Sequence, residues 1–125
     1  MQEQKRMPER RQAKRVMVRE GAVAFLGEVP GTILDISEKG ISVRFVVFEH
    51  EPEPQCSLDL FFAEDDFYLA GLQAELVSDI PVDCPGGGNQ ARNRARRLGL
   101  RFRELTPSQR DELCSFIYRN KMARA

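Results

Sequence analysis

Short stretches of alternating apolar and polar residues, separated by turn-forming residues, recur along this chain of 125 residues. In the longest stretch, Tyr68–Leu76, alternate apolar residues share one face, and the polar residues Gln73 and Glu75 lie on the other. Side chains alternate between the two faces of a strand, so a period of two predicts a half-buried β-strand. The residues predicted on its apolar face are Tyr68, Ala70, Leu72, Ala74 and Leu76.

Five further segments carry the residue types or the alternation of strands. Thr32–Ile36 and Ile41–Phe45 flank the turn-forming residues Ser37–Gly40, which predicts a β-hairpin. The other predicted strands are Val16–Val18 with Ala22–Leu26 as one long or broken strand, Leu58–Phe62, and Leu98–Phe102. Antiparallel strands at such even spacing predict a mainly β fold, a small antiparallel β-barrel of about six strands, in which closure removes exposed sheet edges.

A single helix is predicted after the last strand. Thr106 supplies an N-cap, Pro107 stands at the first helical position, and Gln109 follows three residues after the cap. An apolar stripe at helical spacing follows, formed by Leu113, Phe116 and Ile117. We expect a C-terminal α-helix whose stripe packs on the β core.

Nineteen basic and nineteen acidic residues cancel to a net charge of zero, but they are segregated along the chain. Residues 1–19 contain seven basic and two acidic residues, whereas residues 20–83 contain two basic and fourteen acidic residues. A second basic block, between positions 89 and 103, has no acidic residue and contains Arg92, Arg94, Arg96, Arg97, Arg101 and Arg103. Arginines that meet on one surface attract phosphate or nucleic acid, so an anionic ligand is expected.

Other kinds of chemistry find little material in this sequence. The cysteines Cys56, Cys84 and Cys114 are far apart and odd in number, which argues against a disulfide framework. The only histidine, His50, lies in a polar loop, so neither a metal site nor a nucleophilic triad is expected. The acidic run Glu64–Asp66 is interpreted as a solvated turn. We therefore expect a protein that is not an enzyme and needs no cofactor.

The apolar stretches of the chain fall far short of the roughly 20 residues that a membrane-spanning helix needs. Its first residues lack the apolar segment of a secretory signal peptide. We therefore expect a cytoplasmic protein with no membrane span.

Two short motifs stand in order along the chain. Arg11–Arg15 is an R-x-x-x-R motif in the basic N-terminal segment, and Asp35–Gly40 is a D-x-S-x-x-G motif in the predicted hairpin turn. Taken alone, each is more typical of a solvated tail or an ordinary turn. Together with Leu98–Phe102 before the final helix, their order and spacing resemble the PilZ domain over the span Glu9–Asn120.

The resemblance implies a bacterial receptor for cyclic di-GMP, a ligand with two guanines and two phosphates. Arg11 and Arg15 would lie on a flexible basic arm, residues 1–15, that becomes ordered as it folds over the ligand. The planar fork of an arginine can hold guanine edges and phosphates. After the arm, the resemblance implies a single PilZ-like domain over residues 16–125.

The resemblance also assigns roles around the turn. Asp35 would accept hydrogen bonds from guanine N–H groups, Ser37 would reach a base or a phosphate, and Gly40 would permit a tight turn or close ligand approach. Arg10 occupies a position that in this family bears on whether one or two ligand molecules bind. The predicted ligand site consists of Arg10, Arg11, Arg15, Asp35, Ser37 and Gly40.

Two other functions are compatible with the sequence. A stripe formed by the arm and the basic block would bind nucleic acid, although no nucleic-acid-binding motif is present and the middle of the chain is acidic. Alternatively, a PilZ-like adaptor would act through protein contacts without any ligand. The receptor hypothesis is preferred, with an unidentified downstream protein as partner and with nucleic acid not expected. The role of the loop Gly86–Arg97 is left open: the loop would widen the anionic site, contact a partner or be disordered.

Overall fold

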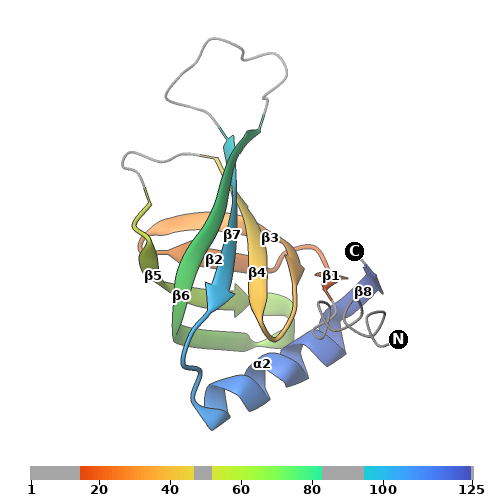
Figure 1. Cartoon of the computed structure of the whole chain (residues 1–125). Coiled ribbons are helices and arrows are strands. Elements are labelled where there is room, and N and C mark those ends of the chain that lie inside the picture. The colour runs from red at the N-terminus through yellow and green to blue at the C-terminus, as the bar shows by residue number, and fades with distance from the viewer. Residues whose placement is uncertain (1–14, 47–51, 83–94, 125) are drawn as a thin grey trace, which may run out of the picture.

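The computed structural model describes residues 15–46, 52–82 and 95–124 of the chain. This part contains eight strands, a 3-10 turn and one α-helix (Figure 1). The strands are β1 (Val16–Val18), β2 (Val23–Leu26), β3 (Val29–Ile36), β4 (Gly40–Phe45), β5 (Gln55–Phe62), β6 (Phe67–Val82), β7 (Ala95–Phe102) and β8 (Lys121–Arg124). The 3-10 turn η1 (Ala63–Asp65) joins β5 to β6, and helix α2 (Pro107–Asn120) lies between β7 and β8.

Six of these strands close into an antiparallel barrel. They are hydrogen-bonded in the order β2-β5-β6-β7-β4-β3, and a further pairing of β3 with β2 completes the ring. Strand β1 joins β3 through the pairing of Val16 with Ile36, and β8 adds to β1 beside the barrel. The prediction of a mainly β barrel with one C-terminal helix is therefore confirmed. Strand β8 was not predicted from the sequence, and the first predicted strand is broken into β1 and β2.

Alternate residues of the strands fill the barrel interior. On β4, Ile41, Val43 and Phe45 are fully buried, and their neighbours Leu98 and Leu100 on β7 are equally inaccessible. Burial of each such side chain contributes about 1.5–3 kcal/mol. The residues between them therefore point to the outer side of the barrel, in a register that the core holds fixed.

Helix α2 crosses one end of the barrel (Figure 1). It begins with the predicted capping box, in which the Thr106 hydroxyl accepts from the Gln109 N–H and the Gln109 side chain accepts from the Thr106 N–H, both at 3.0 Å. Phe116 stacks on Phe67 with ring centroids 4.3 Å apart and meets Phe62 edge to face. The helix thus closes the core at this end. No helix in the described part of the chain is long and apolar enough to span a membrane.

Strand β6 departs from the predicted alternation at a β-bulge. Two of its residues, Ala70 and Gly71, lie opposite the single residue Asp59 of β5. Gly71 has a φ of +73°, which glycine adopts without steric cost, and its N–H donates to the Asp59 carboxylate at 2.9 Å. The extra residue reverses the faces of the strand. The prediction that Tyr68 and Ala70 share the apolar face with Leu72 is wrong, because both are exposed while Leu72 is buried.

Candidate functional site

Ser37 holds the turn between β3 and β4. Its hydroxyl oxygen accepts from the backbone N–H groups of Lys39 and Gly40 at 3.1 and 3.3 Å, and its own N–H donates to the Gly40 carbonyl at 2.8 Å. Serine often satisfies a turn in this way. Because the hydroxyl proton takes no part in these bonds, Ser37 keeps one donor on an otherwise buried side chain.

Asp35 lies on the outer side of β3, two residues before Ser37, with its side chain only 13% exposed. Arg15, immediately before β1, donates from Nη1 to the Asp35 Oδ1 at 2.5 Å. The two residues meet because Val16 pairs with Ile36 where β1 runs along β3. Arg15 remains 46% exposed. The structure therefore joins the last arginine of the R-x-x-x-R motif to the acidic residue of the turn motif.

Gly40 allows two strands to approach closely. A Cβ at this position would lie 2.5 Å from the backbone carbonyl oxygen of Leu100 on β7, a distance that Cβ atoms do not adopt. The φ of Gly40 is not in the left-handed region. The backbone that lies closest to Gly40 is thus that of β7, and the absence of a side chain at Gly40 lets the turn pack tightly against that strand.

A row of small residues runs from Asp35 across the outer side of the next three strands. Asp35 pairs with Ser42 of β4, Ser42 with Gly99 of β7, and Gly99 with Ser78 of β6. We call Ser42, Gly99 and Ser78 the serine row. Since neighbouring strands lie about 4.8 Å apart, the distance from Asp35 to the end of the row is roughly 14 Å. The row itself presents no bulky side chain, and the exposed apolar residues Val77 and Ile80 flank its far end.

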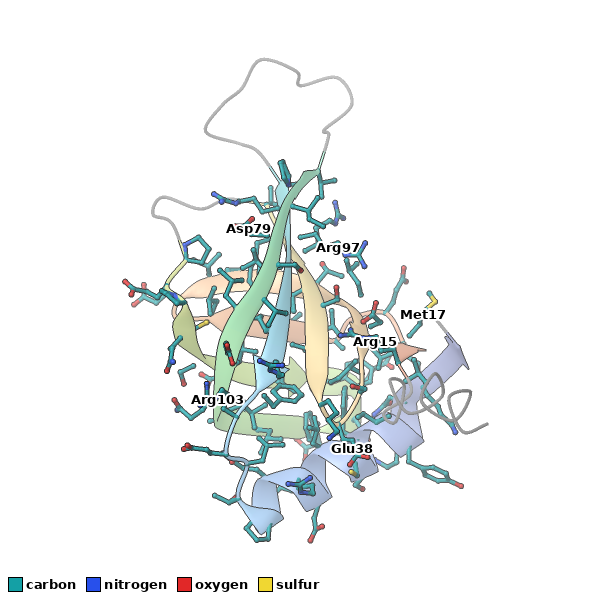
Figure 2. The ribbon with its side chains drawn as sticks, viewed as in Figure 1. Arg15, Met17, Glu38, Asp79, Arg97 and Arg103 are labelled. Carbon is teal, nitrogen blue, oxygen red and sulfur yellow. The ribbon has the colours of Figure 1, made fainter. Side chains whose placement is uncertain are left out.

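Arg97 reaches the serine row from β7. Its Nε donates to the Ser42 Oγ at 3.2 Å. Within the described ranges, no carboxylate pairs with Arg97, so both of its terminal nitrogens keep their donors. Figure 2 shows Arg97 and Arg15 on the same side of the barrel. We call the surface formed by Arg15, Asp35, Ser42 and Arg97 the basic face.

The other described arginines of the basic block are paired with carboxylates. Arg96 donates to Asp79 from Nε and Nη2, at 3.1 and 2.7 Å. Arg101 and Arg103 both bond to Glu75. The hydrogen bond from Arg101, followed by the charges of both arginines, lowers the pKa of Glu75 below its ordinary value. These pairs neutralise three of the four arginines of the block that the structure describes, which disfavours a continuous basic stripe over this part of the surface.

The structure brings together four of the six predicted ligand residues: Arg15, Asp35, Ser37 and Gly40. The other two, Arg10 and Arg11, lie outside the described residues, as do His50 and residues 86–94 of the basic loop.

Sequence reasoning did not single out the serine row, and it identified Arg97 only as one member of the basic block. Alternation along β4 marks Ser42 as an outward residue. Its neighbours on the other strands follow from the strand register, which no local pattern encodes.

The described part of the chain holds no group of three or more His, Cys, Asp or Glu residues able to bind a metal ion. In the acidic run, Glu64 and Asp65 are ion-paired with Arg19 and Arg119. Burial, followed by the charge of a nearby carboxylate, raises the pKa of the Cys114 thiol. A raised pKa reduces the thiolate fraction that a nucleophile needs, so Cys114 does not have the character of a catalytic cysteine.

Comparisons with known proteins agree with this architecture. The family model for the PilZ domain matches residues 9–119. The PilZ domain of YcgR from Escherichia coli, solved with c-di-GMP (cyclic di-GMP), is similar with a TM-score of 0.63 at 15% identity, covering 88% of this chain and 90% of that one. The Borreliella burgdorferi PlzA protein, crystallised in complex with c-di-GMP, has a TM-score of 0.55 at 13% identity, covering 97% of this chain and 58% of that one.

At such identities the two likenesses concern the fold. A search of curated proteins found no match. The family match, by contrast, extends from the basic segment before β1 into the last turn of α2. On that ground, this chain belongs to the PilZ domain family.

Proposed function

We propose that this chain is a non-catalytic receptor for cyclic di-GMP and that the ligand binds on the basic face. The contact between Arg15 and Asp35 carries this proposal, because it puts the last arginine of the R-x-x-x-R motif beside the turn motif on the barrel. The YcgR PilZ domain and PlzA were both solved with c-di-GMP, which supports the same ligand here.

The residues at the turn suit the chemistry of this ligand. Arg15 uses one N–H group on Asp35, and its remaining donors match a guanine edge or a phosphate. The second carboxylate oxygen of Asp35 can accept from guanine N–H groups, and Ser37 adds a hydroxyl donor. Gly40 keeps the turn against β7. By their place in the arginine motif, Arg10 and Arg11 are assigned to the same ligand.

The serine row lies beside the turn and carries no bulky side chain. Ser42 and Gly99 are buried and Ser78 is exposed, so the ligand meets this row at Ser78, whose hydroxyl can donate or accept. The exposed apolar residues at the end of the row suit the face of a base. Arg97 adds a second guanidinium, so each of the two phosphates can meet one arginine, Arg15 or Arg97.

Ligand binding leaves the ion pair between Arg15 and Asp35 in place. A ligand that takes the remaining donors of Arg15 and the second carboxylate oxygen of Asp35 gains several hydrogen bonds at the turn. We expect the basic arm, residues 1–15, to become ordered over the ligand and an unidentified downstream protein to bind the changed surface. The ligand shifts this equilibrium by its higher affinity for the ordered state.

Isothermal titration calorimetry with cyclic di-GMP, and with GMP as the control ligand, tests the proposal. We expect saturable binding of cyclic di-GMP alone. Arg15→Ala should abolish it, whereas Arg110→Ala, which removes an exposed arginine of α2, should not change it. Circular dichroism confirms that both variants are folded. Absence of heat with the folded wild type, or equal affinity of wild type and Arg15→Ala, would contradict the proposal. The stoichiometry of wild type and Arg10→Ala in the same titration tests the role of Arg10.

A further inference from the structure

The outer side of β2, β5 and β6 carries a group of accessible aromatic residues. Phe61 of β5 is 42% exposed and Tyr68 of β6 is 60% exposed. They are direct cross-strand partners, and their rings meet edge to face with centroids 6.4 Å apart. Val23 of β2, which pairs with Phe61, and Phe25 are half-buried on the same surface. We call these four residues the aromatic face.

The core does not require the two exposed rings. Phe62 and Phe67, next to them in sequence, point inward and are buried. Phe61 and Tyr68 point outward, and the bulge at Gly71 reverses the alternation of β6 beyond them. Exposed apolar groups of this kind mark interaction sites on soluble proteins, and aromatic residues are enriched where proteins meet. The aromatic face thus has the composition of the centre of an interface.

The surroundings of the aromatic face are acidic. Strands β2, β5 and β6 contain no Lys or Arg. Asp59 lies opposite Phe25. Exposed carboxylates in the adjoining turns, which form no ion pair with any residue that the structure describes, are Glu20, Glu28 and Asp66. A negative rim around an apolar centre attracts a cationic partner and repels nucleic acid.

We propose that the aromatic face is a docking surface for a protein segment that is both apolar and positively charged. Its apolar side chains cover Phe61 and Tyr68, and its Lys or Arg residues meet the acidic rim. A second copy of the chain is a poorer occupant, because a two-fold contact brings the same acidic rim to both sides. The proposal does not depend on the ligand of the basic face, since the two surfaces share no residue.

Two synthetic peptides of equal length provide the probe, with Leu at the same positions and either Lys or Glu at all others. The peptides are added to the full chain without nucleotide, and backbone amide resonances are recorded by NMR. We expect the Lys peptide to shift the resonances of β2, β5 and β6 and to leave those around Arg15 and Asp35 in place. The Glu peptide should cause no saturable shift.

Substitutions separate the apolar part of the surface from the charged part. The double variant Phe61→Thr/Tyr68→Thr, which keeps residues suited to strands, should weaken binding of the Lys peptide about tenfold or more. Tyr118→Thr removes a 74% exposed tyrosine of α2 outside the aromatic face, and it should leave binding unchanged. Glu28→Gln/Asp66→Asn should cause a smaller loss and reduce the dependence of binding on salt.

The proposal would be overturned if the Lys peptide did not bind, if both peptides bound equally, or if the Phe61→Thr/Tyr68→Thr variant bound as the wild type does. It would also be overturned by a dimer in sedimentation that the double variant lost, because a second copy would then be the occupant. The last such result would be a shift in the resonances of the aromatic face when the five basic residues before Arg15 are replaced by Ala in the full chain, because the chain's own N-terminal segment would then be the occupant.

Discussion

The basic face and the aromatic face occupy outer positions of the same barrel, yet they are built from opposite residue types. The basic face combines two arginines with the Ser42 hydroxyl and a nearly buried carboxylate. The aromatic face combines exposed rings with an acidic rim, on three strands that contain no cation. Both rest on one continuous core. Because strands separate inward from outward residues, the outward set can specify two unlike surfaces without changing the fold.

The two faces also depend on different backbone features. At the basic face, Gly40 lets β4 and β7 approach until only backbone lies between them. At the aromatic face, the bulge at Gly71 has open space around it. A side chain added at Gly40 would push two strands apart, whereas one added at Gly71 would enter open space. Substitution of Gly40 should therefore cost more stability than substitution of Gly71.

The largest effect is therefore expected from Gly40→Ala. The added methyl group would meet the Leu100 carbonyl oxygen at 2.5 Å, so β4 and β7 must separate. We expect the free energy of unfolding to fall by about 2 to 3 kcal/mol, the usual cost of overpacking a tight contact. Urea denaturation followed by circular dichroism measures this change.

Gly27→Ala is the matched control for Gly40→Ala. Gly27 has a φ of +65° with nothing within 4 Å of the added atom, so only the cost of the left-handed conformation applies, about 1 kcal/mol. If Gly40→Ala kept the stability of the wild type and lost only cyclic di-GMP binding, the glycine would serve the ligand and not the strand contact.

A second prediction separates arginines that look alike in the sequence. Arg97→Ala should lower the affinity for cyclic di-GMP about tenfold, which is the scale of one lost charge-assisted hydrogen bond. Arg101→Ala should change it little, because Arg101 is already bonded to Glu75. Calorimetric titration of both variants measures the difference. Equal losses would mean that the ligand senses overall charge rather than the position of Arg97.

Local patterns were sufficient to predict most of the strands and the start of the helix. One such pattern is the alternation in Ile41–Phe45, and another is the pair of capping residues Thr106 and Gln109. Each pattern spans only a few residues, and both predictions are confirmed. Strand β8 was missed because it is specified by pairing with β1, more than a hundred residues away in sequence. The exposed position of Tyr68 was missed because one extra residue in a bulge reverses an alternation that is otherwise regular.

The difference between local patterns and long-range strand pairing also applies to the candidate site. Asp35 and Ser37 could be named because they stand in one short motif, and Arg15 because its motif precedes theirs at the expected spacing. Arg97 and Arg101 are four residues apart on one strand and share the same outward face. Only the register with β4 and β6 decides that one contacts a serine and the other a carboxylate, and register depends on the whole sheet.

A third and smaller effect concerns the β-bulge at Gly71, which shapes the aromatic face. Gly71→Ala should lower the free energy of unfolding by about 1 kcal/mol, since its φ of +73° is costly for a side chain although space is available. Gly71→Asn should cost less, because asparagine tolerates this conformation better than alanine. Urea denaturation of the two variants gives the order. If both variants were as stable as the wild type, the bulge would not depend on a left-handed residue at position 71.

The smallest effect distinguishes two carboxylates by their response to acid. Hydrogen bonds from Arg119 and then Asn120 lower the pKa of Asp65, and the hydrogen bond from Arg101 lowers that of Glu75. A lowered pKa in the folded state stabilises the protein above the ordinary pKa, and this stabilisation is lost as pH falls through the folded value. The urea midpoint of Asp65→Asn and of Glu75→Gln should therefore fall less between neutral and acidic pH than that of the wild type.

Both acid effects should be small and should shrink further in added salt, because these ion pairs are accessible to solvent. Asp65→Asn should reduce the acid response more than Glu75→Gln does, because Asp65 accepts from two nitrogens of Arg119 and from the buried Asn120. Glu20→Gln, at a residue with no ion pair in the described part of the chain, is the control and should follow the wild type. If Glu75→Gln reduced the acid response more than Asp65→Asn does, the ion pairs of Arg101 and Arg103 with Glu75 would contribute more to stability than those of Asp65. The contrast between these paired arginines and Arg97 would then concern stability as well as ligand binding.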